Sequence, residues 1–306
     1  MPGIKSFIKP LVPQALLSAW AYRRRSAAFD ERFKGLPRAE FLSFQCNICG
    51  HDTSYPRHAM SREEWSCMFC GSNVRWRSVI HALSMELFGK SFALPDFPVR
   101  KEIQGVGLSD WEGYAKPLSR KLGYVNTFYH KPPLLDVTSL AAGQQDGIYD
   151  FIISSDVFEH IPQPISRAFN NARRLLKPGG VMIFTVPYVS GVTQEHFPLM
   201  TKFSIEKRGQ RWVLENQKAD GSAELFDDLV FHGGPGTTVE FRLFGKDSLA
   251  RDVASFSEVR IHDETVQEFG ICWNPYDPEH APYRPLIHGL DTPPWALVKD
   301  SAEVSQ

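Results

Sequence analysis

The chain contains no run of residues long and apolar enough to span a bilayer. Its one weakly apolar N-terminal run, residues 7–20, is broken by Lys9, Pro10 and Pro13, and no small-residue cleavage site follows it, so we expect no signal peptide. An excess of either charge is also missing, because 34 Lys and Arg residues stand against 35 Asp and Glu residues. A formal net charge of -1 argues against a general nucleic-acid binder.

Cysteine is scarce, with five residues in a chain of 306. A disulfide framework is typical of small, cysteine-dense secreted chains, so a reducing cytoplasm fits this sequence better. The composition, 42% hydrophobic and 23% charged, is that of a globular protein with room for one full α/β domain and a smaller module.

Four of the five cysteines form two CxxC pairs, and a glycine follows each pair. The ligand set Cys46, Cys49, Cys67 and Cys70 predicts a tetrahedral structural zinc site with no open coordination position. The alternatives are two unrelated reduced pairs or one redox-active pair, although neither pair has a thioredoxin-like βαβ context. The run Arg75–Arg77 after the second pair fits a solvated helix start or an edge that binds phosphate or acidic groups.

Residues 1–40 are basic and show apolar residues at helical spacing, among them Leu16, Leu17, Trp20 and Ala21. We expect a helical arm. It either packs on its own domain or makes peripheral contact with a membrane, the inner membrane included, or with a partner protein.

Strand and helix patterns alternate over residues 99–190, which is typical of a parallel sheet. Tyr149–Asp156 reads as a buried strand with an acid at its carboxyl end, and Ala168–Leu176 as an amphipathic helix. Lys177–Gly180, with the sequence KPGG, ends that helix, and Val181–Pro187 is a second buried strand. The passage Tyr149–Tyr188 resembles the second half of class I S-adenosylmethionine-dependent methyltransferases.

The resemblance implies an α/β fold with a mostly parallel, seven-stranded Rossmann-like sheet. The cysteine pairs in front of it, with Cys70–Arg77, resemble bacterial methyltransferases that carry an N-terminal zinc ribbon. We expect a basic arm at 1–40, a zinc-ribbon module at 41–80 and a methyltransferase domain at 81–270 with an insertion near 191–238. A Pro-rich, extended and surface-bound tail is expected at 271–306.

S-adenosylmethionine is the cofactor that the resemblance implies. Its predicted contacts are Glu102, Gly105, Gly107, Asn126, Asp136, Val137, Ser154 and Asp156. The two glycines stand where the family has a glycine turn, while Ser109 replaces a third glycine. Glu102 would bind the amino group of the cofactor.

The second strand, Gly123–Tyr129, lacks the acid that the family uses for the ribose hydroxyls, so Asn126, Thr127 or water would take that role. By the same analogy Asp136 faces the adenine amino group and the Val137 amide serves a ring nitrogen. Ser154 and Asp156 line the carboxyl edge of the fourth strand.

Transfer to a hydroxyl acceptor needs a base, and histidine has a suitable pKa. His160 follows the fourth strand and His196 follows the fifth, so each is a candidate base, although each could equally be an ordinary loop histidine. Glu195 and Glu159 would orient these rings, bind sugar hydroxyls or hold a divalent ion.

The function predicted from the resemblance is O-methylation of a sugar or of a glycan-linked hydroxyl by a cytoplasmic enzyme. The alternatives are an RNA methyltransferase and a non-catalytic binding module in a glycan-assembly complex. Nucleic acid is not the expected partner, because the net charge is near zero and no amine-type N/D-P-P-Y motif occurs at a suitable place.

Overall fold

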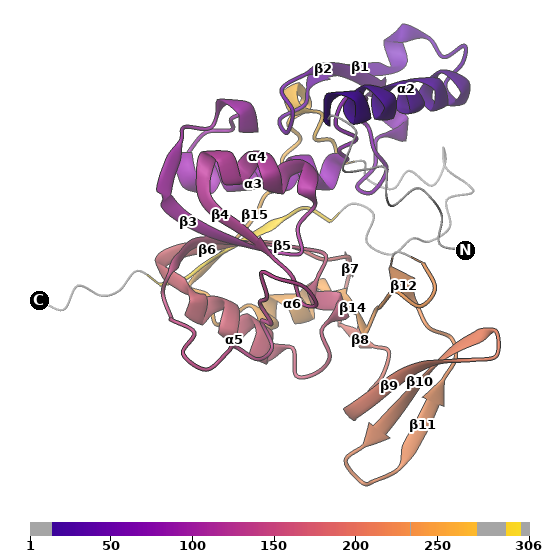
Figure 1. Ribbon diagram of the computed structural model, residues 1–306, viewed down its shortest axis with the longest axis vertical. Coiled ribbons are helices and arrows are strands. Elements are labelled where there is room, and N and C mark those ends of the chain that lie inside the picture. The colour runs from indigo at the N-terminus through magenta and orange to yellow at the C-terminus, as the bar shows by residue number, and fades with distance from the viewer. Residues whose placement is uncertain (1–13, 233, 274–291, 301–306) are drawn as a thin grey trace, which may run out of the picture. The chain divides into compact units, whose positions relative to one another are not determined.

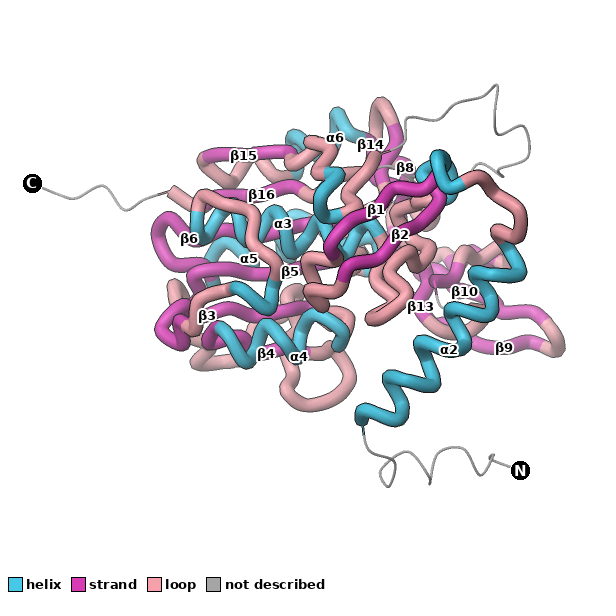
Figure 2. Tube along the Cα trace, turned by 90° about the horizontal axis from the view of Figure 1, so that it is seen from above, coloured by secondary structure: helices cyan, strands magenta, loops and turns pink. Residues whose placement is uncertain are grey.

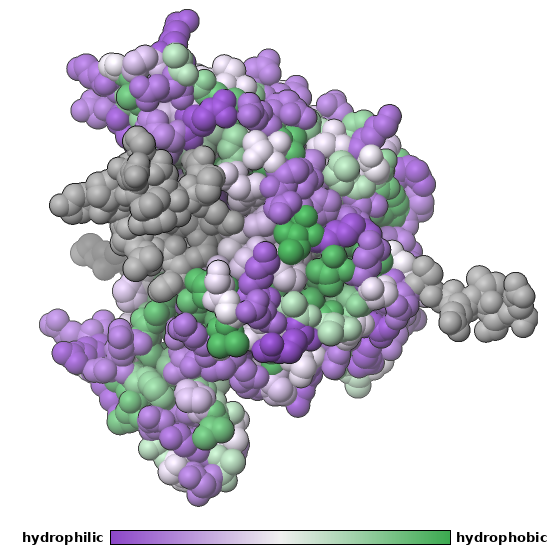
Figure 3. Space-filling view, turned by 180° about the vertical axis from the view of Figure 1, so that it is seen from behind, coloured by the Kyte–Doolittle hydropathy of each residue, from purple (hydrophilic) through white to green (hydrophobic). Residues whose placement is uncertain are grey.

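A computed structural model describes residues 14–232, 234–273 and 292–300 of the chain (Figure 1). The described residues form two compact units, one from 14–98 and 263–273 and the other from 99–262 and 292–300. Within these ranges no helix has both the length and the apolar character needed to cross a membrane. On the face drawn in Figure 3, hydrophobic side chains lie in separate groups among hydrophilic ones.

The first unit holds two long helices and one hairpin. Its elements are α2 (Gln14–Arg32), η2 (Arg38–Glu40), β1 (Phe41–Gln45), β2 (Asp52–Pro56), η3 (Arg57–Ala59), α3 (Val74–Phe88), η4 (Leu94–Asp96) and η6 (Gln267–Phe269). The strands β1 and β2 are antiparallel. Asn73 caps α3 by accepting a hydrogen bond from the Trp76 amide over 2.9 Å, and Gly89 ends the helix at a φ of 66°.

The helix α2, whose path is drawn in Figure 2, packs one face on the rest of the first unit through aromatic contacts and hydrogen bonds. Phe29 and Phe33 contact the buried Tyr55, with ring centroids 5.6 and 5.3 Å apart. Arg25 donates hydrogen bonds to the carbonyl oxygens of Met68, over 2.7 Å, and of Phe69. On this face α2 packs on its own unit, as one of the two interpretations of the arm expects. The opposite side of α2 is exposed.

The second unit is built on one six-stranded sheet. Its strands are β3 (Arg100–Leu108), β4 (Leu122–Thr127), β5 (Tyr149–Ser155), β6 (Leu176–Thr185), β15 (Glu258–Ile261) and β16 (Trp295–Val298). The order is β15-β16-β6-β5-β3-β4, and only β16 runs antiparallel to its neighbours. The α/β class and the mostly parallel sheet are thus confirmed, with six strands in the described residues in place of seven.

The segment Leu134–Thr138, which holds the predicted adenine contacts Asp136 and Val137, adds no strand to this sheet. Only a single parallel bridge, Phe128 with Leu134, forms at that sheet edge. Two prolines, Pro132 and Pro133, remove backbone donors just before it, and Asp136 then closes a local turn by accepting hydrogen bonds from the Thr138 amide and hydroxyl.

The predicted tail instead supplies a central strand. Trp295–Val298 lies between β6 and β15, and Ala296 and Leu297 are fully buried. The prolines on the N-terminal side of this strand suggested an extended surface segment, but the four apolar residues WALV fit a strand buried on both faces. The prediction of a surface-bound tail is wrong for these residues.

Helices cover both faces of the sheet. In Figure 1, α4 (Glu112–Lys121) lies on one side of it, and α5 (Ser166–Leu175) with α6 (Lys246–Asp252) lies on the other. The buried side of α5 contains Ala168, Phe169, Ala172 and Leu175, which follow helical spacing and pack against Met182 and Phe184. Truncation of a fully buried ring such as Phe169 to alanine would cost about 3–5 kcal/mol.

Between β6 and α6 the chain forms short strands and a separate antiparallel sheet. These elements are β7 (Tyr188–Val189), β8 (Gln194–Glu195), β9 (Met200–Arg208), β10 (Arg211–Lys218), β11 (Ala223–Phe226), β12 (Phe231–His232), β13 (Thr238–Val239) and β14 (Arg242–Gly245). A small core of Phe197, Leu214, Val239 and Phe241 holds them together. Glu240 and Phe241, between β13 and β14, belong to no strand.

Candidate active site at the carboxyl edge of the sheet

The parallel strands end together at one edge of the sheet. Leu108 is paired with Thr127, and Gly107 with Ile153, so the residues after β3, β4 and β5 are neighbours there. Ser109 and Asp156, which directly follow two of these strands, have φ values of 61° and 55°. Such left-handed residues turn the chain sharply at the edge where open α/β sheets bind ligands.

The two predicted cofactor glycines lie inside β3 and not in the turn after it. A Cβ on Gly107 would come within 2.0 Å of the Tyr124 hydroxyl, and one on Gly105 within 2.1 Å of the Phe151 ring. The space beside both glycines is therefore filled by the protein itself. The two glycines therefore allow close packing within the sheet, and their contact with the cofactor stays a prediction.

Glu102 also lies away from the predicted place. It is six residues before the end of β3, near the amino end of that strand, and its exposed side chain pairs with Arg100. The prediction placed Glu102 at the end of the strand, just before a glycine turn, whereas the strand continues to Leu108. The structure therefore corrects its assignment to the cofactor amino group.

Asn126 and Asp110 lock the turn after β3. Asn126 Oδ1 accepts from the Asp110 amide over 2.9 Å, and its Nδ2 donates to the Asp110 carbonyl over 2.8 Å. The Tyr124 hydroxyl donates to Asp110 Oδ2 over 2.5 Å, and burial strongly raises the pKa of this tyrosine. Asn126 thus positions the turn, and its direct contact with the ribose stays a prediction.

The other predicted cofactor residues do reach the edge or its vicinity. Asp156 accepts from the Thr185 hydroxyl over 2.9 Å, and Ser154 has a fully buried hydroxyl with no hydrogen-bond partner within the described residues. Asp136 is half-buried in its turn, and the carbonyl of Val137 accepts from Asn171. Carboxylates and a hydroxyl at this edge suit a ligand with an amine and ribose hydroxyls, so the edge fits S-adenosylmethionine on the side of Asp136, Ser154 and Asp156.

A cluster of histidine and glutamate side chains follows β5. Glu159 and His160 belong to η5 (Phe158–His160), which backbone hydrogen bonds join to the strands after β6. The Phe241 amide donates to the Glu159 carbonyl over 2.8 Å, and the His196 amide donates to the Phe241 carbonyl over 2.9 Å. Both predicted histidines are therefore brought to one place.

Glu240 is the centre of this cluster. Its two carboxylate oxygens pair with His196 Nε2 at 2.9 Å and with His232 Nε2 at 3.0 Å. Burial would raise the pKa of Glu240, but the hydrogen bonds from these two rings outweigh it and lower the pKa to about 2. The sequence did not indicate Glu240 or His232, because neither lies in a recognisable motif and the pairing with His196 spans 44 residues.

The ring of His160 is positioned by a hydrogen bond through its Nδ1. Its Nδ1 donates to the Val239 carbonyl over 2.8 Å, since a carbonyl can only accept. Burial lowers its pKa, so the ring is neutral near pH 7.

Glu195 has a structural partner. Arg242 is completely buried. Its Nε donates to Glu195 Oε1 over 2.8 Å, and its Nη1 donates to the carbonyls of Phe158 and Ile161. A buried guanidinium needs a counter-charge, and removal of either member of such a pair costs several kcal/mol, about 3–5. Glu195 is thus the counter-charge of a buried cation, and its catalytic role stays a prediction.

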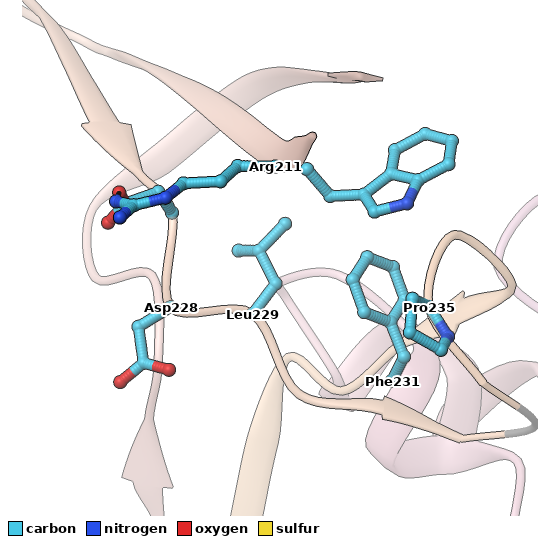
Figure 4. A pocket seen from close by; sticks show the side chains of 7 residues that line it. Arg211, Asp228, Leu229, Phe231 and Pro235 are labelled. Atoms are coloured by element: carbon cyan, nitrogen blue, oxygen red, sulfur yellow. Dashed lines mark hydrogen bonds and ion pairs between the residues drawn. The ribbon is translucent and has the colours of Figure 1, made fainter. Parts of the chain in front are cut away.

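A pocket of about 410 Å³ opens beside the antiparallel sheet (Figure 4). It is lined by Arg211, Trp212, Asp227, Asp228, Leu229, Phe231 and Pro235. The rings of Trp212 and Phe231 lie 6.1 Å apart, and Arg211 pairs with Asp227 over 2.8 Å. None of the clustered histidines lines the pocket, but Phe231 directly precedes His232 in β12.

The four paired cysteines form a second site, in the first unit. Cys46 Sγ lies 3.6 Å from Cys70 Sγ, Cys49 Sγ lies 3.7 Å from Cys67 Sγ, and no two of the four are disulfide-bonded. Zinc–sulfur bonds of about 2.3 Å in a tetrahedron place sulfurs about 3.8 Å apart. Gly50 and Gly71, at φ values of 76° and 79°, close the two turns with hydrogen bonds to Cys46 and Cys67. The donor set therefore fits zinc.

Arg77 supports this second site from within. The guanidinium is completely buried and donates to the Ser72 carbonyl over 3.1 Å and to the Ser66 hydroxyl over 2.8 Å. Arg75 is also engaged, since it pairs with Glu63 over 2.7 Å. Neither arginine forms the solvated or phosphate-binding edge that the sequence suggested.

The family model described as "Methyltransferase domain" matches residues 39–226, which is more than half of the chain. The chain therefore belongs to this methyltransferase domain family. The membership confirms the S-adenosylmethionine-dependent methyltransferase class that the passage Tyr149–Tyr188 indicated. A comparison with curated proteins gives no significant match.

Solved structures similar to this chain include other methyltransferases. The 1,6-didemethyltoxoflavin-N1-methyltransferase of Burkholderia thailandensis is 12% identical, with 73% of this chain and 79% of that one covered and a TM-score of 0.35. The CurJ carbon methyltransferase is 16% identical, with 39% and 37% covered and a TM-score of 0.29. The YcgJ protein of Bacillus subtilis is 16% identical, with 36% and 53% covered and a TM-score of 0.27.

The chain spans between 37% and 50% of the length of the first solved structures that it matches. The family assignment rests on the match of the family model alone.

Proposed function

We propose that the second unit binds S-adenosylmethionine at the carboxyl edge of its sheet and methylates a hydroxyl group of a sugar or of a glycan-linked acceptor. The observation that carries this proposal is the pairing of His196 with Glu240 over 2.9 Å, next to the loop that follows β5. S-adenosylmethionine, when bound, supplies an activated methyl group on a sulfonium.

The residues of this chain then have two tasks. Asp136, Ser154 and Asp156 would hold the cofactor, and His196 would take the proton from the acceptor hydroxyl. With its Nε2 hydrogen donated to Glu240, the neutral ring has its lone pair on Nδ1, and the carboxylate stabilises the imidazolium that forms. The side chain of His196 is 30% exposed, so an acceptor can reach it.

The pocket beside the antiparallel sheet supports a sugar as acceptor. The flat faces of Trp212 and Phe231 suit the apolar face of a sugar ring, and the carboxylates of Asp227 and Asp228 can accept hydrogen bonds from its hydroxyls. Phe231 packs against the small core that contains Phe197 and Phe241, which are next to His196 and Glu240 in the sequence. Acceptor recognition and proton removal would thus use the same group of strands.

Calorimetric titration of the full chain with S-adenosylmethionine and S-adenosylhomocysteine tests the first half of the proposal. We expect saturable binding of both. Transfer of a labelled methyl group to a panel of sugars, glycans and RNA tests the second half, and label on a sugar hydroxyl is the expected result. Failure to bind the cofactor would favour a non-catalytic binding module, and label on RNA alone would favour an RNA methyltransferase.

We also propose that the four cysteines hold one structural Zn²⁺. The sulfur–sulfur spacing of 3.6–3.7 Å and the two left-handed glycines support this assignment. Thiolate ligands agree with a cytoplasmic, reducing location, which remains a prediction.

The exposed side of α2 is proposed as a peripheral contact surface for an anionic membrane. Leu16 and Trp20 are 60% and 59% exposed, and the Arg24 guanidinium lies 4.8 Å from the Trp20 ring centroid. Exposed apolar and cationic side chains on one helix are typical of segments that lie on a membrane surface.

A further inference from the structure

Three side chains of the cluster after β5 converge on one point. His160 Nε2 lies 3.8 Å from Glu159 Oε1, and His232 Nδ1 lies 3.9 Å from the same oxygen. The two imidazole rings are perpendicular, with centroids 4.6 Å apart, and the three donor atoms all lie within 4.8 Å of one another. All three residues belong to the second unit.

In each ring, the nitrogen that does not face Glu159 donates a hydrogen bond to an acceptor. His160 Nδ1 donates to the Val239 carbonyl over 2.8 Å, and His232 Nε2 donates to Glu240 Oε2 over 3.0 Å. In a neutral ring this places both lone pairs on the inner nitrogens, His160 Nε2 and His232 Nδ1. An acceptor behind each histidine is the arrangement that fixes the tautomer and orientation of metal-ligating histidines.

We propose that Glu159, His160 and His232 bind a divalent first-row transition-metal cation, with Glu240 as a positioning residue. Two imidazole nitrogens and one carboxylate suit Mn²⁺, Fe²⁺, Co²⁺, Ni²⁺ or Zn²⁺ and disfavour Ca²⁺, which prefers an all-oxygen set. Ligands on one such ion lie about 3.0–3.4 Å apart. The two distances to Glu159 Oε1 would contract by about 0.5 Å, and the two ring nitrogens, within 4.8 Å of each other, would also move together.

Burial and access both fit such a site. The side chain of Glu159 is 1% exposed, and a cation between the two rings would offset the cost of a carboxylate in that position. The side chain of His232 is 37% exposed, which leaves a way in for the ion. Three protein ligands leave coordination positions for water or for an acceptor oxygen.

This site goes beyond the proposed function and does not depend on it. Where both hold, an acceptor hydroxyl on the cation would lose its proton more readily, because a divalent ion lowers the pKa of a bound hydroxyl. His196 lies on the other side of Glu240 from His232 and is not a ligand. Metal binding and the role of His196 can therefore fail separately.

The test is a titration with Co²⁺ of the full chain loaded with one equivalent of Zn²⁺, which fills the four-cysteine site, followed by calorimetry and by absorption. We expect one Co²⁺ per chain with weak visible bands typical of nitrogen and oxygen ligands, and no strong thiolate charge-transfer band. Glu159→Gln and His232→Gln should each lower the affinity at least about tenfold, and Glu240→Gln by about 10–100-fold. His58→Gln, at a histidine with a 58% exposed side chain in the first unit, should leave the affinity unchanged.

Thermal denaturation of each variant without Co²⁺ shows whether it is folded. Because His232 is half-exposed and Glu159 is buried, His232→Gln should disturb the fold less than Glu159→Gln. The proposal is overturned if wild-type protein takes up no Co²⁺ beyond the cysteine site. It is equally overturned if folded His232→Gln and Glu159→Gln bind Co²⁺ as the wild type does. His196→Ala should keep full Co²⁺ affinity even if it abolishes methyl transfer.

Discussion

Arg77 donates a hydrogen bond to the carbonyl oxygen of Gly270 over 2.8 Å, across 193 positions of the sequence and in a fully buried place. The same guanidinium binds the Ser72 carbonyl beside the second cysteine pair. One side chain thus binds both the four-cysteine site and the segment at 263–273. Loss of the metal should therefore destabilise both parts of the first unit.

Cys46→Ser and Cys70→Ser should each lose the metal. We expect about one zinc per chain in the wild type by metal analysis and close to none in either variant, because three thiolates no longer close the tetrahedron. The first unit should become sensitive to proteolysis, while the sheet of the second unit stays protected. Cys272→Ser, at the buried cysteine outside the cluster, is the control and should keep its zinc. Metal-free wild-type protein with an intact first unit would disprove the zinc assignment.

Arg25→Gln should weaken the hold on zinc without touching a ligand. Arg25 binds the carbonyls of Met68 and Phe69, which lie between the two cysteines of the second pair. The matched controls are Arg23→Gln and Arg24→Gln on the exposed side of α2. Competition with a chelator should release zinc from the Arg25 variant first, and equal release from all three variants would contradict the packing of α2 on this pair.

Gly107→Ala should destabilise the second unit even when no cofactor is present. The added Cβ would lie 2.0 Å from the Tyr124 hydroxyl and 2.3 Å from Asp110 Oδ2, and such overpacking costs about 1–3 kcal/mol or more. Tyr124→Phe in the same chain should recover part of the loss. Thermal melts of the two single variants and the double variant measure this coupling. An unchanged melting temperature with lost cofactor affinity would instead restore the cofactor role of Gly107.

His196→Ala should lower turnover by about 10²–10⁴-fold, the usual range for loss of a general base. Cofactor affinity should change little, because the residues proposed to hold the cofactor follow other strands. Glu240→Gln should lower turnover less, since the ring remains but loses its counter-charge. Full activity in His196→Ala with activity lost in His160→Ala would move the base to His160.

Asp252→Asn should stabilise the protein at neutral pH. Burial raises the pKa of this carboxyl above its unfolded value, so the stability it contributes is full below about pH 4 and is lost as pH rises through the folded pKa. The gain at pH 7 should be about 0.5 kcal/mol, because the group is partly solvated. Melts at pH 7 and pH 3.5 test this, with the exposed Asp228→Asn as control; a gain that persists at pH 3.5 would contradict it.

The fold class and the second half of the sheet could be predicted because their signals are local. Tyr149–Asp156 and Val181–Pro187 are short apolar runs that lie largely within β5 and β6. The prediction that KPGG ends the helix is wrong in detail, because α5 ends at Leu175 and β6 already begins at Leu176 and includes KPGG. The position of Trp295–Val298 could not be predicted in this way. A four-residue strand among prolines shows its place only through pairing with β6, more than a hundred positions earlier in the chain.

The candidate site shows the same division. The cysteine ligands and the two loop histidines could be identified from motif and from order along the chain. Glu240, His232 and Arg242 could not, since their roles come from contacts with residues 44 to 84 positions away. The packing role of the glycines of β3 could not be predicted either, because only the packed structure shows the Tyr124 and Phe151 side chains that fill the space beside them.

The first unit is built from two segments that lie far apart in the sequence, and this has a consequence for biosynthesis. A ribosome that has released residues 14–98 has not yet made Gly270, so Arg77 must wait for its acceptor while the whole of 99–262 is translated. Zinc capture by the cysteine pairs needs only the early segment and can come first. The four-cysteine site would then form first on the ribosome, and most of the sheet of the second unit would follow. Residues 263–273 would pack on the first unit after that, and β16 would join the sheet last.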